Sequence, residues 1–115
     1  MKITRSFLGF LLTADVTLLN TGIHILLTGG YQSHIGSLSA ARPRENPRTL
    51  TFPGHREQAV SEQWAAALAH RLNAPAAVVC GIHYDDLSRE DLARLLRLLD
   101  EMLEEVLSSL PAPIG

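Results

Sequence analysis

The first third of the chain has the residue pattern of β-strands. Residues 3–19 are rich in Leu, Ile, Val, Phe and Thr, and residues 23–28 form a second apolar run that ends at Gly29-Gly30. Residues 34–41 alternate apolar with polar or small side chains, as a strand with one buried face does. Because the connections are short, we expect an antiparallel meander, with a bend or break of the first run near Asp15.

The middle of the chain predicts a loop, a short strand and a helix. Residues 42–48 are polar and contain two prolines, and residues 49–52 are expected to add a short strand before Pro53-Gly54 interrupts the chain. In the helix predicted over residues 55–72, the apolar positions recur every fourth residue; they are Val60, Trp64, Leu68 and Leu72. Proline disfavours helix in the residue before it, so Asn73-Ala74-Pro75 ends this helix.

A buried strand and a long helix complete the chain. Residues 76–82 are continuously apolar, which is typical of a central strand buried on both faces. The second helix is predicted over 88–109, with Ser88 as N-cap and Asp91 three residues later, as in a capping box. Its buried stripe consists of Leu92, Leu95, Leu96, Leu99, Met102, Leu103 and Val106. Leu98 and Leu107 widen this stripe, which hints at a dimer interface.

These elements predict one α/β (α+β) domain over residues 1–115, with a core at about 3–109 and a flexible tail at 110–115. The order is strand, strand, strand, an optional short strand, helix, strand, helix. We expect a mostly antiparallel sheet with both helices packed on one face. The other face is then polar or covered, and a homodimer would cover it.

Composition excludes several classes of protein. The 115 residues are 46% hydrophobic and 19% charged, which argues against disorder. A net charge of −2 argues against a nucleic-acid-coating protein. Residues 6–12 are too short to span a membrane and are interpreted as a strand rather than a signal peptide. One cysteine, Cys80, excludes an intramolecular disulfide and fits a cytoplasmic location.

Three segments combine histidine with glycine at the ends of predicted elements. They are Gly29-Gly30-Tyr31-Gln32-Ser33-His34-Ile35-Gly36, Pro53-Gly54-His55-Arg56-Glu57 and Gly81-Ile82-His83-Tyr84-Asp85. Glycine lets a backbone approach a ligand closely, and histidine titrates near neutral pH and binds metals. Because ligand sites gather at strand ends and helix starts, we expect these segments to contribute to one site.

Each segment also has a structural interpretation that stays open. At the start of the first helix, free amides and Arg56 suit an anion. Glu57 falls on the core side of that helix, so it needs a partner or ligand, unless it merely caps the first turn. Asp85 can orient His83, or both can be ordinary loop residues. The segment from Gly29 to Gly36 can cradle a ligand or form a simple hairpin.

Two further kinds of chemistry receive less support from the sequence. His34, His55 and His83 together suit a zinc site, although they follow no recognised spacing. A serine nucleophile is disfavoured because no nucleophile elbow is present. Arg42, Arg44 and Arg48 can meet an anionic ligand or partner, although such a run is usually a solvated loop.

In order and spacing, the three glycine-histidine segments resemble the motifs of the LpdD-like prenylated-flavin chaperone domain. The resemblance covers about residues 5–105. It implies a proteasome-assembly-chaperone-like fold that dimerises, and a non-catalytic accessory protein that binds or delivers prenylated FMN, or FMN itself. The implied partner is the catalytic subunit of an aromatic acid decarboxylase.

The resemblance also implies a set of cofactor-binding residues and no catalytic or metal residue. These are Gly29, Gly30, His34, Gly36, His55, Arg56, Glu57, His83 and Asp85. The helix start and Arg56 are expected to hold the phosphate, and the histidines with Glu57 to meet polar groups of the flavin. Tyr31 is a candidate for stacking on a ring. Two alternatives stay open: an assembly chaperone without a cofactor, and a small histidine-based metal enzyme.

Overall fold

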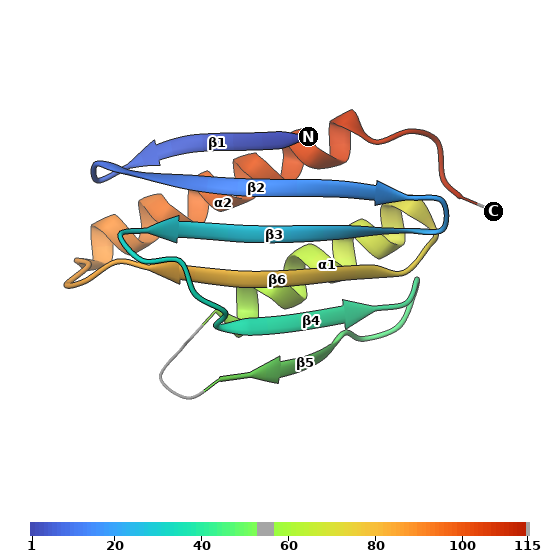
Figure 1. The fold of residues 1–115 in the computed structure, drawn as a ribbon, viewed down its shortest axis with the longest axis horizontal. Helices are drawn as coiled ribbons and strands as arrows, with labels where there is room; N and C mark the ends of the chain where they lie inside the picture. The colour runs from blue at the N-terminus through green and yellow to red at the C-terminus, as the bar shows by residue number, and fades with distance from the viewer. Residues whose placement is uncertain (53–56, 115) are drawn as a thin grey trace.

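The fold is one six-stranded sheet with two helices on one face, in a computed structural model that describes residues 1–52 and 57–114 (Figure 1). The strands are β1 (Lys2–Phe7), β2 (Phe10–Leu19), β3 (Gly22–Gly30), β4 (Ser37–Ala41), β5 (Arg48–Thr51) and β6 (Ala76–His83), and the helices are α1 (Gln58–Leu72) and α2 (Arg89–Ser109). This confirms the mixed architecture and the placement of both helices on one face.

The first apolar run breaks at Leu8-Gly9, so the break expected near Asp15 is wrong. Phe7 pairs with Phe10, which leaves a two-residue turn whose φ angles are +50° at Leu8 and +82° at Gly9. Two positive φ angles match the twist of a tight hairpin. Asp15 instead lies in the middle of β2, paired with both Lys2 and Leu26, so neighbouring strands hold it extended.

The third predicted strand does not continue the meander. The sheet order is β1-β2-β3-β6-β4-β5, so β6 lies between β3 and β4, parallel to β3 and antiparallel to β4. Figure 1 shows the segment after β3 crossing β6 to reach β4. The strand also begins at Ser37 rather than residue 34, because residues 34–36 form part of this crossing.

β6 is central, as predicted, but it is fully buried on only one face. Ala76, Val78 and Cys80 lie in the core between the sheet and the helices. Ala77 and Val79 point to the opposite face and are half-buried. That opposite face has no helix over it within the described residues (Figure 1).

Both helices pack against the sheet mainly through the apolar positions that the sequence predicts. Trp64, Leu68 and Leu72 of α1 are buried, and α1 ends at Asn73 in a left-handed conformation. In α2, Ser88 Oγ accepts a hydrogen bond from the backbone N–H of Asp91, which confirms the predicted N-cap.

The buried stripe of α2 begins later than the sequence predicts. Leu92 and Leu96 are 46% and 45% exposed, whereas Leu98 and Leu107, predicted to be surplus, pack partly against the core. The reason is position: the first turns of α2 lie at the end of the sheet beside the loop that follows β6 (Figure 1). Apolar side chains at this end of α2 therefore have little sheet to cover.

Residues 110–114, part of the tail expected to be flexible, lie against α1. Leu110 is buried, and the backbone N–H of Ile114 donates to the carbonyl of Leu72 over 2.6 Å. Arg71 donates to the carbonyls of Leu110 and Pro111. These contacts join the end of α2 to the end of α1.

Candidate functional site

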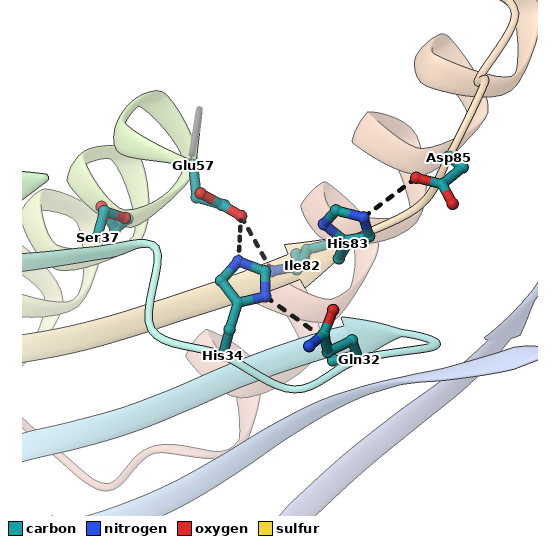
Figure 2. Close-up of polar contacts among 8 residues, drawn as sticks. Gln32, His34, Ser37, Glu57, Ile82, His83 and Asp85 are labelled. Carbon is teal, nitrogen blue, oxygen red and sulfur yellow. Dashed lines mark hydrogen bonds and ion pairs between the residues drawn. The ribbon is translucent and has the colours of Figure 1, made fainter. Parts of the chain in front are cut away.

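Two of the three glycine-histidine segments meet at one end of the sheet. Gly30, the last residue of β3, pairs with His83, the last residue of β6. The chain then leaves β3 through residues 31–36 and crosses β6, so His34 lies beside Gly81. Glu57 reaches this end from the start of α1 (Figure 2). Ligand sites commonly form where parallel strands end, because loops converge there.

Glu57 is the central residue of this cluster. It is only 8% exposed, and its Oε1 accepts hydrogen bonds from His34 Nε2 (2.9 Å) and from the backbone N–H of Ile82 (3.3 Å). It occupies the N-cap position of α1 but makes no side-chain cap hydrogen bond, so the capping interpretation is wrong. Its Oε2 has no hydrogen-bond partner among the described residues. A buried acceptor of this kind is costly unless a ligand or solvent satisfies it.

Glycines allow the backbone to pass close to this cluster. A Cβ atom on Gly36 would lie 2.2 Å from Glu57 Oε2, and one on Gly81 would lie 1.7 Å from the carbonyl oxygen of His34. A Cβ on Gly30 would collide with the carbonyl oxygen of His83 at the same distance, 1.7 Å. The three glycines therefore create the space in which the crossing segment meets β6 and Glu57.

His83 and Asp85 form the second polar pair. His83 Nε2 lies 3.1 Å from Asp85 Oδ1, which confirms that Asp85 can orient this imidazole (Figure 2). The Tyr31 ring lies edge-on to the His83 ring, with centroids 4.9 Å apart, and the His34 ring is 5.8 Å from that of His83. A hydrogen bond to Asp85 is the main cause that raises the pKa of the Tyr31 phenol.

Beneath Glu57, the interface between α1 and the sheet is unusually polar. Ser61 of α1 contacts Ser37 and Ser39 of β4 through hydroxyl hydrogen bonds of 2.8 and 2.7 Å, and Ser39 also contacts Thr49 of β5. Burial, and secondly the negative charge of Glu57, raise the pKa of the neighbouring Cys80 thiol. Cys80 is therefore an un-ionised core residue at neutral pH and no nucleophile.

An apolar cleft of about 400 Å³ opens next to Glu57. Its walls come mainly from α2 and β6 and include Leu92, Leu95, Leu96, Leu99 and Ile82. Glu57 and His83 line the same cleft, and so does Tyr84, whose phenol pKa is raised by burial. The site therefore combines an apolar wall with a small number of polar groups, as ligand sites usually do.

The structure thus brings together five of the predicted site residues by direct contact. They are His34, Gly36, Glu57, His83 and Asp85, with Gly30 packed against the backbone of His83. Gly29 lies apart, because a Cβ there would meet the core side chain of Leu12. His55 and Arg56 lie outside the described residues.

The predicted cofactor-binding residues do not include Gly81, although it begins the third segment, and the sequence did not predict the apolar cleft. The signal for the cleft lies in Leu92 and Leu96 at the start of the second helix, which the helical period places in the buried stripe. Within residues 1–52 and 57–114, no group of three or more His, Cys, Asp or Glu side chains is placed to hold a metal ion.

A larger hollow of about 660 Å³ lies at the opposite end of the sheet. It contains Arg42, Arg48 and His24, and Arg42 forms an exposed ion pair with Glu45 at 3.7 Å. Arg44 instead donates to Asn73 Oδ1. Of the predicted cofactor-binding residues that the structure describes, none lines this hollow, so we place the candidate site at the Glu57 end.

Neither helix in the described part of the chain is long and apolar enough to cross a membrane.

Comparisons with known proteins agree with this architecture. The model of the family described as prenylated flavin chaperone LpdD-like domain matches residues 7–111. Protein LpdD of Lactiplantibacillus plantarum is 24% identical over 109 residues, which cover 90% of this chain and 80% of that protein. A chain from the crystal structure of a chaperone complex for yeast 20S proteasome assembly has a TM-score of 0.58 at 15% identity, covering 96% of this chain and 98% of that chain.

The structural likeness confirms the predicted proteasome-assembly-chaperone-like fold, and the family match confirms the resemblance seen in the three motifs. A family of chaperones implies a non-catalytic accessory role. The match covers nearly the whole chain, and the chain therefore belongs to the prenylated flavin chaperone LpdD-like family.

Proposed function

We propose that this chaperone binds prenylated FMN at the Glu57 end of the sheet and delivers it to an aromatic acid decarboxylase. The observation that carries the proposal is the buried carboxylate of Glu57, whose Oε2 lacks a partner among the described residues while two imidazoles lie beside it. Family membership supports prenylated flavin as the ligand.

The polar groups present suit a flavin. The ring system of a flavin carries carbonyl oxygens and an N–H group at one edge, which need donors and an acceptor respectively. His83 supplies a ring nitrogen, Glu57 supplies the acceptor oxygen, and His34 holds the Glu57 carboxylate through its Nε2. Tyr31, exposed beside His83, is placed to lie against a bound ring. The reactive ring of the flavin serves decarboxylation in the partner enzyme, whereas this chain holds and orients it.

The phosphate end of the cofactor is assigned from the sequence. Arg56, with His55, precedes α1 and would hold the phosphate where helix amides attract anions. Gly30 and Gly36 would let the backbone approach the bound group, and Asp85 would keep the His83 ring oriented.

Titration with prenylated FMN and with FMN tests the proposal. We expect Glu57→Gln to weaken flavin binding at least about tenfold, because a buried acceptor next to the ligand becomes partly a donor. Glu104→Gln, on the exposed face of α2, is the matched control and should bind like the wild type. His83→Ala serves as a second variant, and because this side chain is 35% exposed we expect the fold to persist. Failure of wild-type protein to bind either flavin at tens of micromolar would contradict the proposal.

Delivery to the decarboxylase is tested separately. If the chain carries the cofactor, the folded His83→Ala variant should activate the decarboxylase less than the wild type does. If it is an assembly chaperone without a cofactor, the same variant should activate the enzyme fully, because the site would then only be strand-end packing.

We also propose that the chain is a cytoplasmic homodimer that covers its open sheet face. One row across four strands on that face is apolar: Leu26 pairs with Val79, Val79 with Leu38, and Leu38 with Leu50. Leu26, Leu38 and Leu50 are 38%, 37% and 59% exposed. Exposed apolar rows of this kind typically mark an interface, and a second copy brings the same row. The lone buried Cys80 supports a reducing compartment.

A further inference from the structure

We propose that the cleft beside Glu57 holds the isoprenoid-derived ring of the prenylated flavin, so that the exposed leucines at the start of α2 let this chaperone distinguish prenylated FMN from FMN. The inference rests on the proposed function and adds the part of the site that would contact the prenyl-derived ring. None of the motifs that carry the family resemblance contains these leucines.

Two leucines at the start of α2 are placed to contact a ligand in the cleft. Leu92 and Leu96 lie one helical turn apart, so they project from the same side of α2. Both are nearly half exposed, yet both line the cleft. Leu95 and Leu99 of the same helix are buried and also border the cleft. Two large apolar side chains thus remain exposed to solvent beside the cleft, and a ligand in the cleft would cover them.

A buried carboxylate narrows the kinds of ligand that the cleft can hold. Glu57 is more than nine-tenths buried by its side chain, lines the cleft, and has an oxygen without a partner among the described residues. An apolar opening alone suits many occupants. An apolar opening lined by a buried acceptor selects a molecule that presents a hydrogen-bond donor or a positive charge beside an aliphatic or ring surface.

The volume of the cleft suits one part of a cofactor. A volume of about 400 Å³ lies at the lower end of the range, roughly 300–1,000 Å³, of small-molecule sites. It suits part of a large cofactor better than the whole of one. The remaining polar parts of the flavin then fall outside the cleft, next to His83 at its polar end.

The remainder of the cleft supports a ring as the occupant. Ile82 and Tyr84 lie on the β6 side, and the Tyr84 ring is fixed edge-on against Phe7 with centroids 5.2 Å apart. An apolar ring added to a flavin would displace water from these surfaces and from the two leucines. FMN, which lacks that ring, would leave the leucines as exposed as they are in the free protein.

The experiment compares two ligands in two matched variants. The double variant Leu92→Gln/Leu96→Gln removes the apolar wall, and because both positions are exposed on a helix the fold is expected to persist. The control is Ala93→Gln, which places the same side chain on the exposed face of the same helix turn. Affinities for prenylated FMN and for FMN are measured by calorimetry or fluorescence, and circular dichroism verifies the fold.

We expect the double variant to bind prenylated FMN at least about tenfold more weakly than the wild type, and FMN within about twofold of the wild type. The control should match the wild type for both ligands. Equal weakening of both ligands, or no weakening of either, would overturn the inference while leaving the proposed function intact.

Two other outcomes are distinguishable from this one. If wild-type protein binds neither flavin, the proposed function itself fails. If the double variant keeps its preference for prenylated FMN but changes its oligomeric state, the leucines belong to a protein interface, and the inference is again overturned.

Discussion

At the scale of single residues, the site depends on two glycines, which have no side chain to block a neighbouring group. Gly36 and Gly81 both leave room for an approaching group, but the groups differ. Gly36 faces the carboxylate of Glu57, which can move, whereas Gly81 faces the backbone of His34, which is held by its neighbours in the crossing segment. Substitutions at these two positions therefore separate an effect on binding from an effect on folding.

We predict that Gly81→Ala lowers the free energy of unfolding by about 2 kcal/mol or more, because overpacking against backbone forces the sheet or the crossing segment to shift. Gly36→Ala should cost less than about 1 kcal/mol but should still weaken flavin binding by displacing Glu57. Chemical denaturation and flavin titration of both variants provide the measurements. Equal losses of stability in the two variants would contradict this distinction.

Cys80 gives a pH prediction. Its pKa in the folded chain is raised above the ordinary value of 9.0 by burial and by Glu57. Above that value the unfolded chain loses the thiol proton while the folded chain keeps it, so stability falls as pH rises. Between pH 9 and 10 we expect the free energy of unfolding to drop by about 1 kcal/mol more in the wild type than in Cys80→Ala.

Denaturation curves at pH 7, 9 and 10 check the Cys80 prediction. Identical pH dependence in the wild type and in Cys80→Ala would show that the thiol ionises equally in both states. Below about pH 8, the contribution of this group to the pH dependence should vanish, because the thiol is then protonated in the folded and in the unfolded chain.

At the scale of elements, α1 packs on β4 through hydrogen-bonded hydroxyl groups as well as apolar contacts. The same network continues from β4 to β5. Ser61 is the hub, because it contacts Ser37 and Ser39 and also donates to the carbonyl of Gln58. Ser37, Ser39 and Ser61 are fully buried, so each hydroxyl needs its partner. This network lies directly behind the start of α1, which carries Glu57.

We predict that Ser61→Ala destabilises the fold by about 1–3 kcal/mol, because it removes the partner of the buried Ser37 hydroxyl and leaves Ser39 with Thr49 alone. Ser108→Ala, at an exposed position near the end of α2, should change stability by less than about 0.5 kcal/mol. Thermal or urea denaturation of the two variants makes the comparison. A Ser61→Ala variant as stable as the control would mean that a water molecule replaces the Ser61 hydroxyl as the partner of Ser37 and Ser39.

At the scale of the whole molecule, one face of the sheet is covered by helices and the other carries an apolar row. Leu26 is the register partner of Asp15 on β2, and the row runs from Leu26 through Val79 and Leu38. The candidate flavin site lies at one end of the sheet, so an interface on the open face leaves it accessible.

We predict that the wild-type chain elutes at twice its mass of 12.6 kDa in light-scattering chromatography. Leu50→Lys, at an exposed position of edge strand β5, should shift it toward the monomer, because a charge replaces an apolar contact and meets its own copy across a twofold interface. Ala93→Lys on α2 adds the same charge elsewhere and should leave the mass unchanged. A wild-type monomer at micromolar concentration would contradict the dimer.

The sequence by itself determined most of the secondary structure and the composition of the site. The period of apolar residues located both helices, since a helix must bury one stripe, and Ser88 marked the start of α2 because an N-cap hydroxyl acts locally. Three short motifs predicted that Glu57, His34 and His83 contribute to one site, and the three side chains lie together. Glu57 stood out because a carboxylate on the core side of a helix must meet a partner.

Tertiary structure alone decided how these parts meet. The insertion of β6 between β3 and β4 is a long-range pairing that no local pattern encodes, and it brings His83 to Gly30 and the crossing segment to Gly81. Leu92 and Leu96 fit the helical period as well as Leu95 and Leu99 do. They lie beside the cleft instead of in the core because the first turns of α2 are at the end of the sheet, where few strand residues face the helix.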